Sequence, residues 1–368
     1  MNILRRLPIY RLLLLTGLVL ALGIGATAIA LALGSGSKPP QKPLAQALHD
    51  ALSAPAVEGV SASVKLTNHL LEGASLASGS GQGGEVTSNP LLSGASGRLW
   101  IAKDGRARLE LQAEKGDTQV IYDGSTVTVY DAASNTLYRY KPPADEGSSS
   151  PPPAVSHSHE PPSVAKIEEA ITHIKEHAIL SAASPDNVGG APAYTVRVSP
   201  KQGGSLLGGA ELSFDAANGA PLRAAVYSTT SSSPVIELAA TEVSFGAVPD
   251  SVFSFTPPAN AKVEEITAPA AGKGTKTGAA ADKGSKPKLT THGEGPATIA
   301  VLESKLPAGK QGSSAALEGL PKVTINGASA SELRTALGTI LTFERSGVRY
   351  VLAGSDTPAA IEALARGL

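Results

Sequence analysis

The chain contains no cysteine in its 368 residues. This absence excludes disulfide bonds, thiolate nucleophiles, cysteine-ligated metals and a lipid-modified N-terminal cysteine. Aromatic residues make up only 4%, and 31 basic residues nearly balance 32 acidic ones, for a formal net charge of −1. Because no net positive field surrounds the chain, nothing attracts nucleic acid or acidic substrates in general, and we expect no nucleic-acid partner.

The sequence also lacks the motifs of common enzyme classes. It has no G-x-S-x-G elbow between a strand and a helix, no P-loop and no dinucleotide-binding fingerprint. Four histidines (His157, His159, His173 and His177) raise the question of a zinc site, since the last two lie four residues apart on one expected helix. No acidic third ligand has a compelling spacing, so we interpret them as solvated surface residues. We therefore expect a non-enzyme without catalytic residues, metal or cofactor.

The abundant residues are glycine (39) and proline (27), which suit a turn-rich sheet with linkers. Residues 97–140 are short runs of alternating apolar and polar residues, separated by turns rich in aspartate, glycine and serine. Period-2 alternation marks half-buried strands, and such turns close hairpins. The stretch therefore predicts an antiparallel meander with one apolar face. Its apolar positions are Leu99, Ile101, Leu109, Leu111, Val120, Tyr122, Val127, Val129, Tyr138 and Tyr140.

Residues 12–33 form an uncharged apolar run. As a helix these 22 residues would span about 33 Å, enough to cross the hydrocarbon core of a bilayer. Arginines precede the run, so the positive-inside rule makes residues 1–11 a cytoplasmic tail and places the rest outside the cytoplasm. A cleaved signal peptide of a secreted or periplasmic protein is the alternative, because Ala28-Ile29-Ala30 offers a small-residue cleavage site. The length of the run favours a single-pass membrane anchor.

Two helices are expected around the meander. Residues 34–43 form a linker, and the following helix carries Leu44, Leu48 and Leu52 on one side. After the meander, residues 163–180 carry an apolar stripe that falls within an arc of about 80° on a helix. This second helix must bury its stripe, and we expect it to lie over the meander as a lid.

A second domain follows a lysine-bearing, low-complexity linker at residues 267–288. The linker separates a domain at residues 44–266 from a smaller α+β domain at residues 289–368. In the smaller domain we expect strands at 297–303 and 321–326, a helix at 329–337, a hairpin around Ser346-Gly347 and a terminal helix at 357–367.

The run VIYDGSTVTVYDAASNTLYRY, the helix and strands after it, and the closing VFSFTPP resemble the LolA/RseB-like family of periplasmic lipoprotein-carrier proteins. The resemblance covers residues 44–266. It implies a curved half-barrel with helices across its concave face, and either an apolar cavity for acyl chains or lipoproteins, or a sensing role towards a membrane anti-sigma factor. The segments THGEGPATIAVLES and RSGVRYVLAGSDTPAAIEALARGL resemble the small second domain of RseB-type envelope-stress regulators.

The expected fold class is therefore α+β: a curved antiparallel β half-barrel with a helical lid, a small C-terminal α+β domain and an N-terminal transmembrane helix. The expected function is binding of a lipid or lipidated protein between sheet and helix, outside the cytoplasm of a bacterial cell. The alternative is a sigma-factor regulatory protein that binds a membrane partner. Alternation alone leaves open which strand face points inward. The residues expected to line the cavity or its lid are Trp100, Ile101, Leu109, Leu111, Val120, Val129, Ile167, Ile171 and Ile174.

Overall fold

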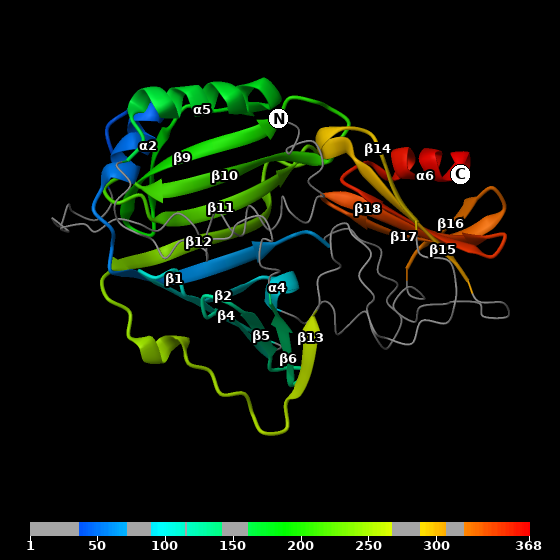
Figure 1. The fold of residues 1–368 in the computed structure, drawn as a ribbon, viewed down its shortest axis with the longest axis horizontal. Helices are drawn as coiled ribbons and strands as arrows, with labels where there is room; N and C mark the ends of the chain where they lie inside the picture. The colour runs from blue at the N-terminus through cyan, green and yellow to red at the C-terminus, as the bar shows by residue number, and fades with distance from the viewer. Residues whose placement is uncertain (1–36, 72–89, 115, 142–160, 267–287, 307–319) are drawn as a thin grey trace, which may run out of the picture.

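The computed structural model describes residues 37–71, 90–114, 116–141, 161–266, 288–306 and 320–368. These residues form two sheets, which lie side by side (Figure 1). We call the larger sheet with its helices the large unit, and the smaller sheet with its helix the small unit. The whole of the expected membrane anchor, residues 12–33, lies outside the described residues. Among the residues that are described, no helix is both long and apolar enough to cross a membrane.

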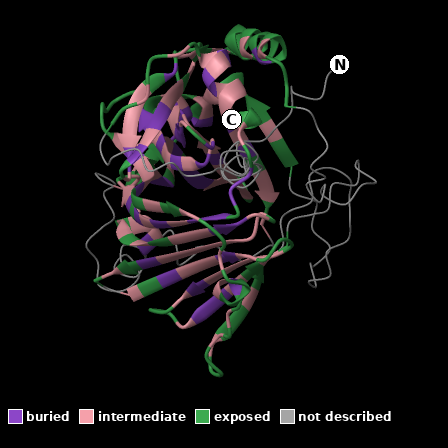
Figure 2. Ribbon diagram, turned by 90° about the vertical axis from the view of Figure 1, so that its left-hand side faces the viewer, coloured by how far each residue is buried: buried purple, intermediate pink, exposed green. Residues whose placement is uncertain are grey.

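The large sheet has 13 strands, in the order β13-β6-β5-β4-β3-β2-β1-β12-β11-β10-β9-β7, with β8 paired to β9. All pairs are antiparallel except β13 with β6, and the sheet is open and curved (Figures 1 and 2). The strands are β1 (Gly59–Asn68), β2 (Ala95–Ala102), β3 (Ala107–Ala113), β4 (Gly116–Tyr122), β5 (Val127–Asp131), β6 (Thr136–Tyr140), β7 (Ala178–Leu180), β8 (Ser184–Val188), β9 (Ala191–Pro200), β10 (Leu207–Asp215), β11 (Pro221–Ser228), β12 (Pro234–Phe245) and β13 (Lys262–Ile266).

The predicted meander is confirmed as β2 to β6, each strand pairing with the next. Its register separates two faces. Leu99 pairs with Leu109, Leu109 with Val120, and Val120 with Val129, so these side chains share the face that we call the apolar face. Arg108 lies on the other side of the sheet, which we call the Arg108 face.

Helix α2 (Leu44–Ser53) packs on the apolar face at β9 and β10. Leucines spaced four residues apart put the apolar side chains on one stripe of the helix. That stripe joins Ala47 to the buried rings of Tyr194 and Phe214, whose centroids are 6.0 Å apart. One end of the apolar face is therefore closed by a helix.

Helix α5 (Val164–His177) begins after Ser163, whose side chain accepts a hydrogen bond from the Lys166 amide. The prediction that this helix covers the meander is wrong. Its main contacts are with α2 and β7, at the opposite end of the sheet from the meander (Figure 1). The physical reason is that no linker separates α5 from edge strand β7. Because β7 pairs with β9, the helix is held beside α2. The expected last residues of the helix form β7 instead.

The Arg108 face of the meander is covered by residues 249–261, which we call the strap. The strap includes the 3₁₀ turn η2 (Asp250–Phe253), and the Val252 carbonyl accepts a hydrogen bond from Arg108 Nη1 at 2.7 Å. The ring of Phe255 lies 5.3 Å from that of Tyr130, centroid to centroid. These contacts close the Arg108 face of the meander, so the meander's more open side is the apolar one.

The small unit is a six-stranded antiparallel sheet in the order β14-β15-β19-β18-β17-β16. Helix α6 (Pro358–Gly367), capped by Thr357, packs on one face through Ile361 and Ala365. The expected terminal helix and the hairpin at Ser346-Gly347 are thus confirmed. The strands are β14 (Lys288–His292), β15 (Ile299–Lys305), β16 (Lys322–Ile325), β17 (Ala328–Thr335), β18 (Gly338–Arg345) and β19 (Val348–Gly354).

The helix predicted at residues 329–337 is wrong, since this stretch forms most of β17. Asn326 and Gly327 have φ angles of 47° and 83° and turn the chain from β16 into β17. Asn-Gly is the favoured pair for such a hairpin turn. Pairing with strands on both sides overrides the helical propensity of the alanines and the glutamate that follow.

Candidate functional site

From β6 across to β9, the apolar face of the large sheet is almost free of charge. The same face continues from the meander through β1 and β12 to β9. Leu66 pairs with Leu238, and Leu212 pairs with Val196, on this side of the sheet. In strands β1 to β6 and β9 to β12, the only charged residue in register with this face is Asp131, at the turn end of β5. The other charged residues of these strands lie on the Arg108 face or at turns. Edge strand β13, in contrast, brings Lys262 and Glu264 into register with Thr136 and Tyr138 of the apolar face.

Three elements cover parts of the apolar face. Helix α2 covers its β9–β10 end, and the tip of the β8–β9 hairpin brings Val188 against Ala62 and Ala240 near the centre. The short helix α4 (Pro90–Ser93) contacts β3 and β4, where Leu111 and Thr118 are fully buried. Between these covers, many apolar side chains stay only half-buried. They include Leu99, Leu109, Val120, Val129, Tyr138, Val196, Leu212, Val226 and Leu238.

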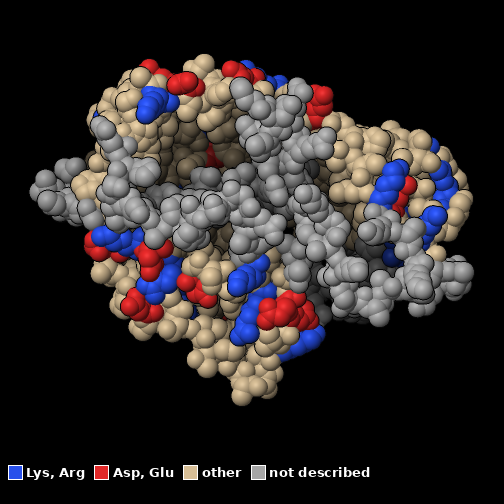
Figure 3. Space-filling view, viewed as in Figure 1, with Lys and Arg blue, Asp and Glu red and all other residues tan. Residues whose placement is uncertain are grey.

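A hollow opens beneath α2 and α5 in the space-filling view, walled mainly by uncharged atoms (Figure 3). In the ribbon drawn from the same side, strands β9 and β10 lie at this place (Figure 1). A contiguous, half-exposed apolar surface of this kind is unusual for a soluble protein and marks binding sites. The arrangement can hold an apolar group by burial alone, without polar recognition.

Five of the predicted site residues share the apolar face: Ile101, Leu109, Leu111, Val120 and Val129. Ile101 and Leu111 are already buried, at 6% and 0% exposure, whereas the other three are half-buried and lie open to a ligand.

The other four predicted site residues lie elsewhere. Trp100 pairs with Arg108 and so belongs to the Arg108 face, because successive residues of a strand point to opposite sides. Ile167, Ile171 and Ile174 are on α5, away from the meander, and Ile174 is 46% exposed. Register and the place of α5 therefore do not bring the nine residues together on one face.

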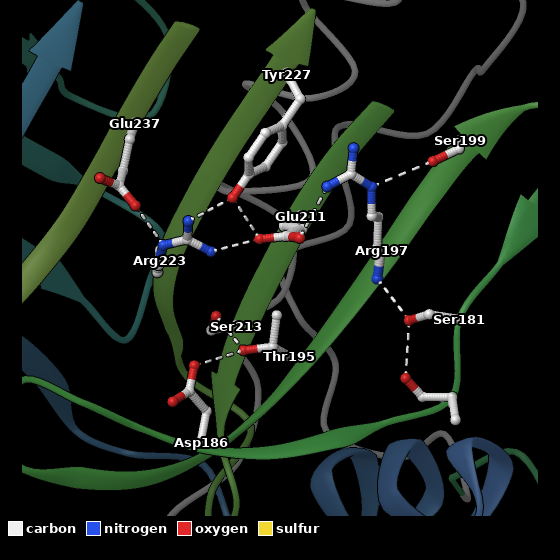
Figure 4. Close-up of polar contacts among 11 residues, drawn as sticks. Ser181, Asp186, Thr195, Arg197, Ser199, Glu211, Ser213, Arg223, Tyr227 and Glu237 are labelled. Atoms are coloured by element: carbon white, nitrogen blue, oxygen red, sulfur yellow. Dashed lines mark hydrogen bonds and ion pairs between the residues drawn. The ribbon is translucent and has the colours of Figure 1, made fainter. Parts of the chain in front are cut away.

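A cluster of charged residues on the Arg108 face was not predicted (Figure 4). Glu211 accepts hydrogen bonds from Arg223 at 2.9 Å, Tyr227 at 2.7 Å and Arg197 at 3.2 Å. Arg223 also donates to Glu237, and the Arg197 guanidinium lies 4.3 Å from the Tyr227 ring centroid. Two positive and two negative charges thus pair across β9 to β12. The cluster ties four neighbouring strands together.

The cluster shifts the ionisation of its members. Burial raises the pKa of Glu211, but hydrogen bonds from Arg223, Tyr227 and Arg197 outweigh this and lower the pKa below its ordinary value. Burial, together with the hydrogen bond to Glu211, raises the pKa of Tyr227. The carboxylate form of Glu211 is therefore a stabilising part of the folded sheet.

We predict that this stability is lost in acid. A carboxyl whose pKa is lowered by folding contributes stability above its ordinary pKa, and the contribution disappears as pH falls through the lowered value. Glu211→Gln should lower the free energy of unfolding by about 2 kcal/mol near neutral pH and flatten its decline between about pH 5 and pH 3. Urea unfolding at both pH values measures this. The exposed Glu242 provides the control, since Glu242→Gln should show the same pH dependence as the unmodified chain. If the free energy of unfolding of Glu211→Gln falls with pH as steeply as that of the unmodified chain, the prediction is contradicted.

A sequence signal for the cluster did exist. Each of the strands β9 to β12 carries a charged residue inside a run of mainly apolar or small residues: Arg197, Glu211, Arg223 and Glu237. Strand β10 also ends on Asp215, and β12 also contains Glu242. Alternating signs on consecutive strands predict cross-strand ion pairs once the strands are known to be neighbours. Only the strand order supplied that knowledge.

His173 and His177 are exposed on α5. Glu176 Oε2 lies 3.1 Å from His173 Nδ1 and 3.9 Å from His177 Nε2. Among the described residues, no group of three or more histidine, cysteine, aspartate or glutamate side chains is arranged to hold a metal ion. His157 and His159 lie outside the described residues.

The fold and the site together define a β-sheet protein with one mainly apolar, half-exposed face and a small α+β unit at its edge. No family model matches the chain, and no curated protein matches it. Among solved structures, it is similar to MucB in complex with MucA(peri), with 14% identity and a TM-score of 0.42 over 88% of this chain and 94% of that one.

Two further structures show the range of the similarity. The MucA/MucB complex of Pseudomonas aeruginosa has 14% identity and a TM-score of 0.39, over 87% of this chain and 95% of that chain. A LolA superfamily protein from Nitrosomonas europaea has 9% identity and a TM-score of 0.19, over 87% of this chain and 97% of that chain. The solved structures to which the chain is similar thus include MucB and a LolA superfamily protein, the kinds of protein that the sequence resembles. Residue roles do not transfer at these identities.

Proposed function

We propose that this protein is a membrane-tethered, extracytoplasmic binding protein that holds a lipid or a lipoprotein acyl chain on the apolar face. The observation that carries the proposal is the row Leu99, Leu109, Val120 and Val129, half-buried on a face with almost no charge. Each methylene of an acyl chain that such a surface buries contributes about 0.8 kcal/mol. A long chain therefore binds without specific polar contacts.

The proposed site lies in a different place from the one expected from the sequence. The acyl chain would lie along the apolar face, towards the hollow beneath α2 and α5, rather than between the meander and α5. The tether we propose is the apolar run at residues 12–33. The division into domains at 44–266 and 289–368, joined by a linker, remains part of the same proposal, as does the absence of enzymatic activity.

Two neighbouring residues of β5 test the proposal. Val129 lies on the apolar face and Thr128 on the opposite face, and both are half-buried. Val129→Asp places a charge against the acyl chain, and we expect the amount of lipid that co-purifies with the full-length chain to fall more than about tenfold. The matched control, Thr128→Asp, should leave it unchanged. Native mass spectrometry measures the bound lipid, and equal lipid in both variants would overturn the proposal.

The second candidate is a regulator that binds a membrane protein. A protein partner is suggested by two of the similar structures, in which MucB is in complex with MucA. The observation in this chain that favours a protein partner is on the small unit. Leu289, Leu302 and Ile340 share the side of its sheet opposite α6 and are 65%, 37% and 40% exposed. Exposed apolar patches of this kind mark protein contacts. A regulator would keep its partner in Val129→Asp, whereas a lipoprotein carrier would lose its cargo.

A further inference from the structure

The large and small units are joined by hydrogen bonds at two places. One is at Leu70, whose carbonyl accepts a hydrogen bond from the Ala336 amide at 3.1 Å, and the other, which we call the joint, is at Ser205 and Asp356. Ser205, before β10, forms an antiparallel bridge with Asp356, which follows β19. The Leu206 amide donates to the Ser355 carbonyl at 2.5 Å, and Ser205 Oγ donates to the same oxygen at 3.1 Å. Within the described residues, none of the buried hydrophobic clusters includes residues of both units. Hydrogen bonds rather than a shared core therefore hold the joint together.

A carboxyl group is buried in this joint without a partner. Asp356 is only 5% exposed, and its Oδ2 makes no hydrogen bond. Its main-chain carbonyl accepts a hydrogen bond from Thr339 Oγ1 at 3.2 Å. An ionised carboxylate that loses its hydration without gaining donors is unfavourable, and burial accordingly raises the pKa of Asp356.

The surroundings supply no compensating charge. The segments around the joint are the loop at 201–206, the turn at 294–298, the start of β18 and the first turn of α6. Their charged residues are Lys201, whose Nζ donates to the Lys175 carbonyl on α5, and Glu294. Asp356 makes no ion pair with either, so only the neutral acid suits the joint.

We propose that the joint is a pH-sensitive hinge, in which the small unit is docked on the large unit while Asp356 is neutral and is loosened when Asp356 ionises. The sign follows from linkage. In the undocked state Asp356 meets water, with an ordinary pKa of 3.8. Docking is then fully favoured below that value and weakens as pH rises through the higher pKa of the docked state. The hinge is independent of the apolar-ligand proposal.

The absence of cysteine allows a direct test. Spin labels on Glu242→Cys in the large unit and Lys305→Cys in the small unit, both exposed positions, report the distance between the units in the full-length chain. By double electron–electron resonance, we expect a broad distance distribution at about pH 8 that narrows as the pH is lowered towards 3.8, the ordinary pKa of the carboxyl. Asp356→Asn mimics the neutral acid and should give the narrow distribution at both pH values.

The matched control is Glu344→Gln, a carboxyl-to-amide change elsewhere in the small unit, which should leave the pH response intact. The proposal is overturned if the unmodified joint gives the same distribution at both pH values, or if Asp356→Asn responds to pH as the unmodified chain does. Should Asp356→Asn fail to fold, the Leu206 amide gives a second measurement. Its hydrogen exchange, corrected for the intrinsic rate, should slow severalfold as pH falls; an unchanged corrected rate overturns the hinge.

Discussion

Replacing Arg334 by alanine should lower the free energy of unfolding of the small unit by about 3 kcal/mol. Glu332, on β17, is fully buried under α6, and its Oε2 accepts a hydrogen bond from Arg334 Nε at 2.6 Å. Its other oxygen, Oε1, is buried without a hydrogen-bond partner. Arg334 is therefore what compensates this buried charge, and its loss leaves a carboxylate without water or a counter-charge.

A half-buried ion pair in the same unit is the control. Arg349 donates to Glu344 at 2.7 Å, and both side chains reach solvent. Arg349→Ala should therefore change stability by at most about 1 kcal/mol. Adding Glu332→Leu to Arg334→Ala should restore most of the lost stability, because it removes the buried charge itself. Thermal or urea unfolding measures all three variants, and equal effects of the two arginine substitutions would contradict the prediction.

Gly97→Ala should destabilise the meander by about 3 kcal/mol or more. Gly97 lies on β2 opposite Leu111, and a Cβ at this position would stand 1.8 Å from the Glu110 carbonyl oxygen. Both groups belong to the backbones of paired strands, so no side-chain rotation can relieve the contact. Strands β2 and β3 would have to separate, which breaks the sheet at the centre of the proposed site.

The single tryptophan, Trp100, lies three residues along the same strand and reports this change. Its fluorescence during urea unfolding should show a lower midpoint for Gly97→Ala. The control is Gly246→Ala, because a Cβ there would meet nothing within 4 Å. A midpoint for Gly97→Ala equal to that of Gly246→Ala would show that the strands accommodate the methyl group.

The local patterns of the sequence predicted several elements correctly. Alternation in the meander and turn residues such as Ser346-Gly347 act over two to six residues. They can therefore be recognised in the sequence without knowing which strands pair. The same logic was available at Asn326-Gly327, where the turn signal should have outweighed the helical propensity of the residues after it. Local chemistry decides such hairpins because register follows from the turn.

The candidate site was predictable only in part. Five apolar meander residues do share a face, because period 2 forces Leu109, Val120 and Val129 to the same side once their strands pair. Trp100 was expected in the cavity but lies on the Arg108 face. An aromatic residue on a strand suggests burial without showing on which face of the sheet it is buried. The amphipathic stripe of α5 shows that the helix needs a partner without showing which one.

By itself, the sequence determined the period of each strand, most turns, the lack of cysteine chemistry and the separation of apolar from charged residues along each strand. Tertiary structure alone decided that α5 packs beside α2, that Arg197, Glu211, Arg223 and Glu237 meet, and that Asp356 is buried between the units. The reason is physical: period and turn chemistry depend on bonds between near neighbours in the chain. Strand order and helix docking depend instead on which distant surfaces bury the most apolar area together.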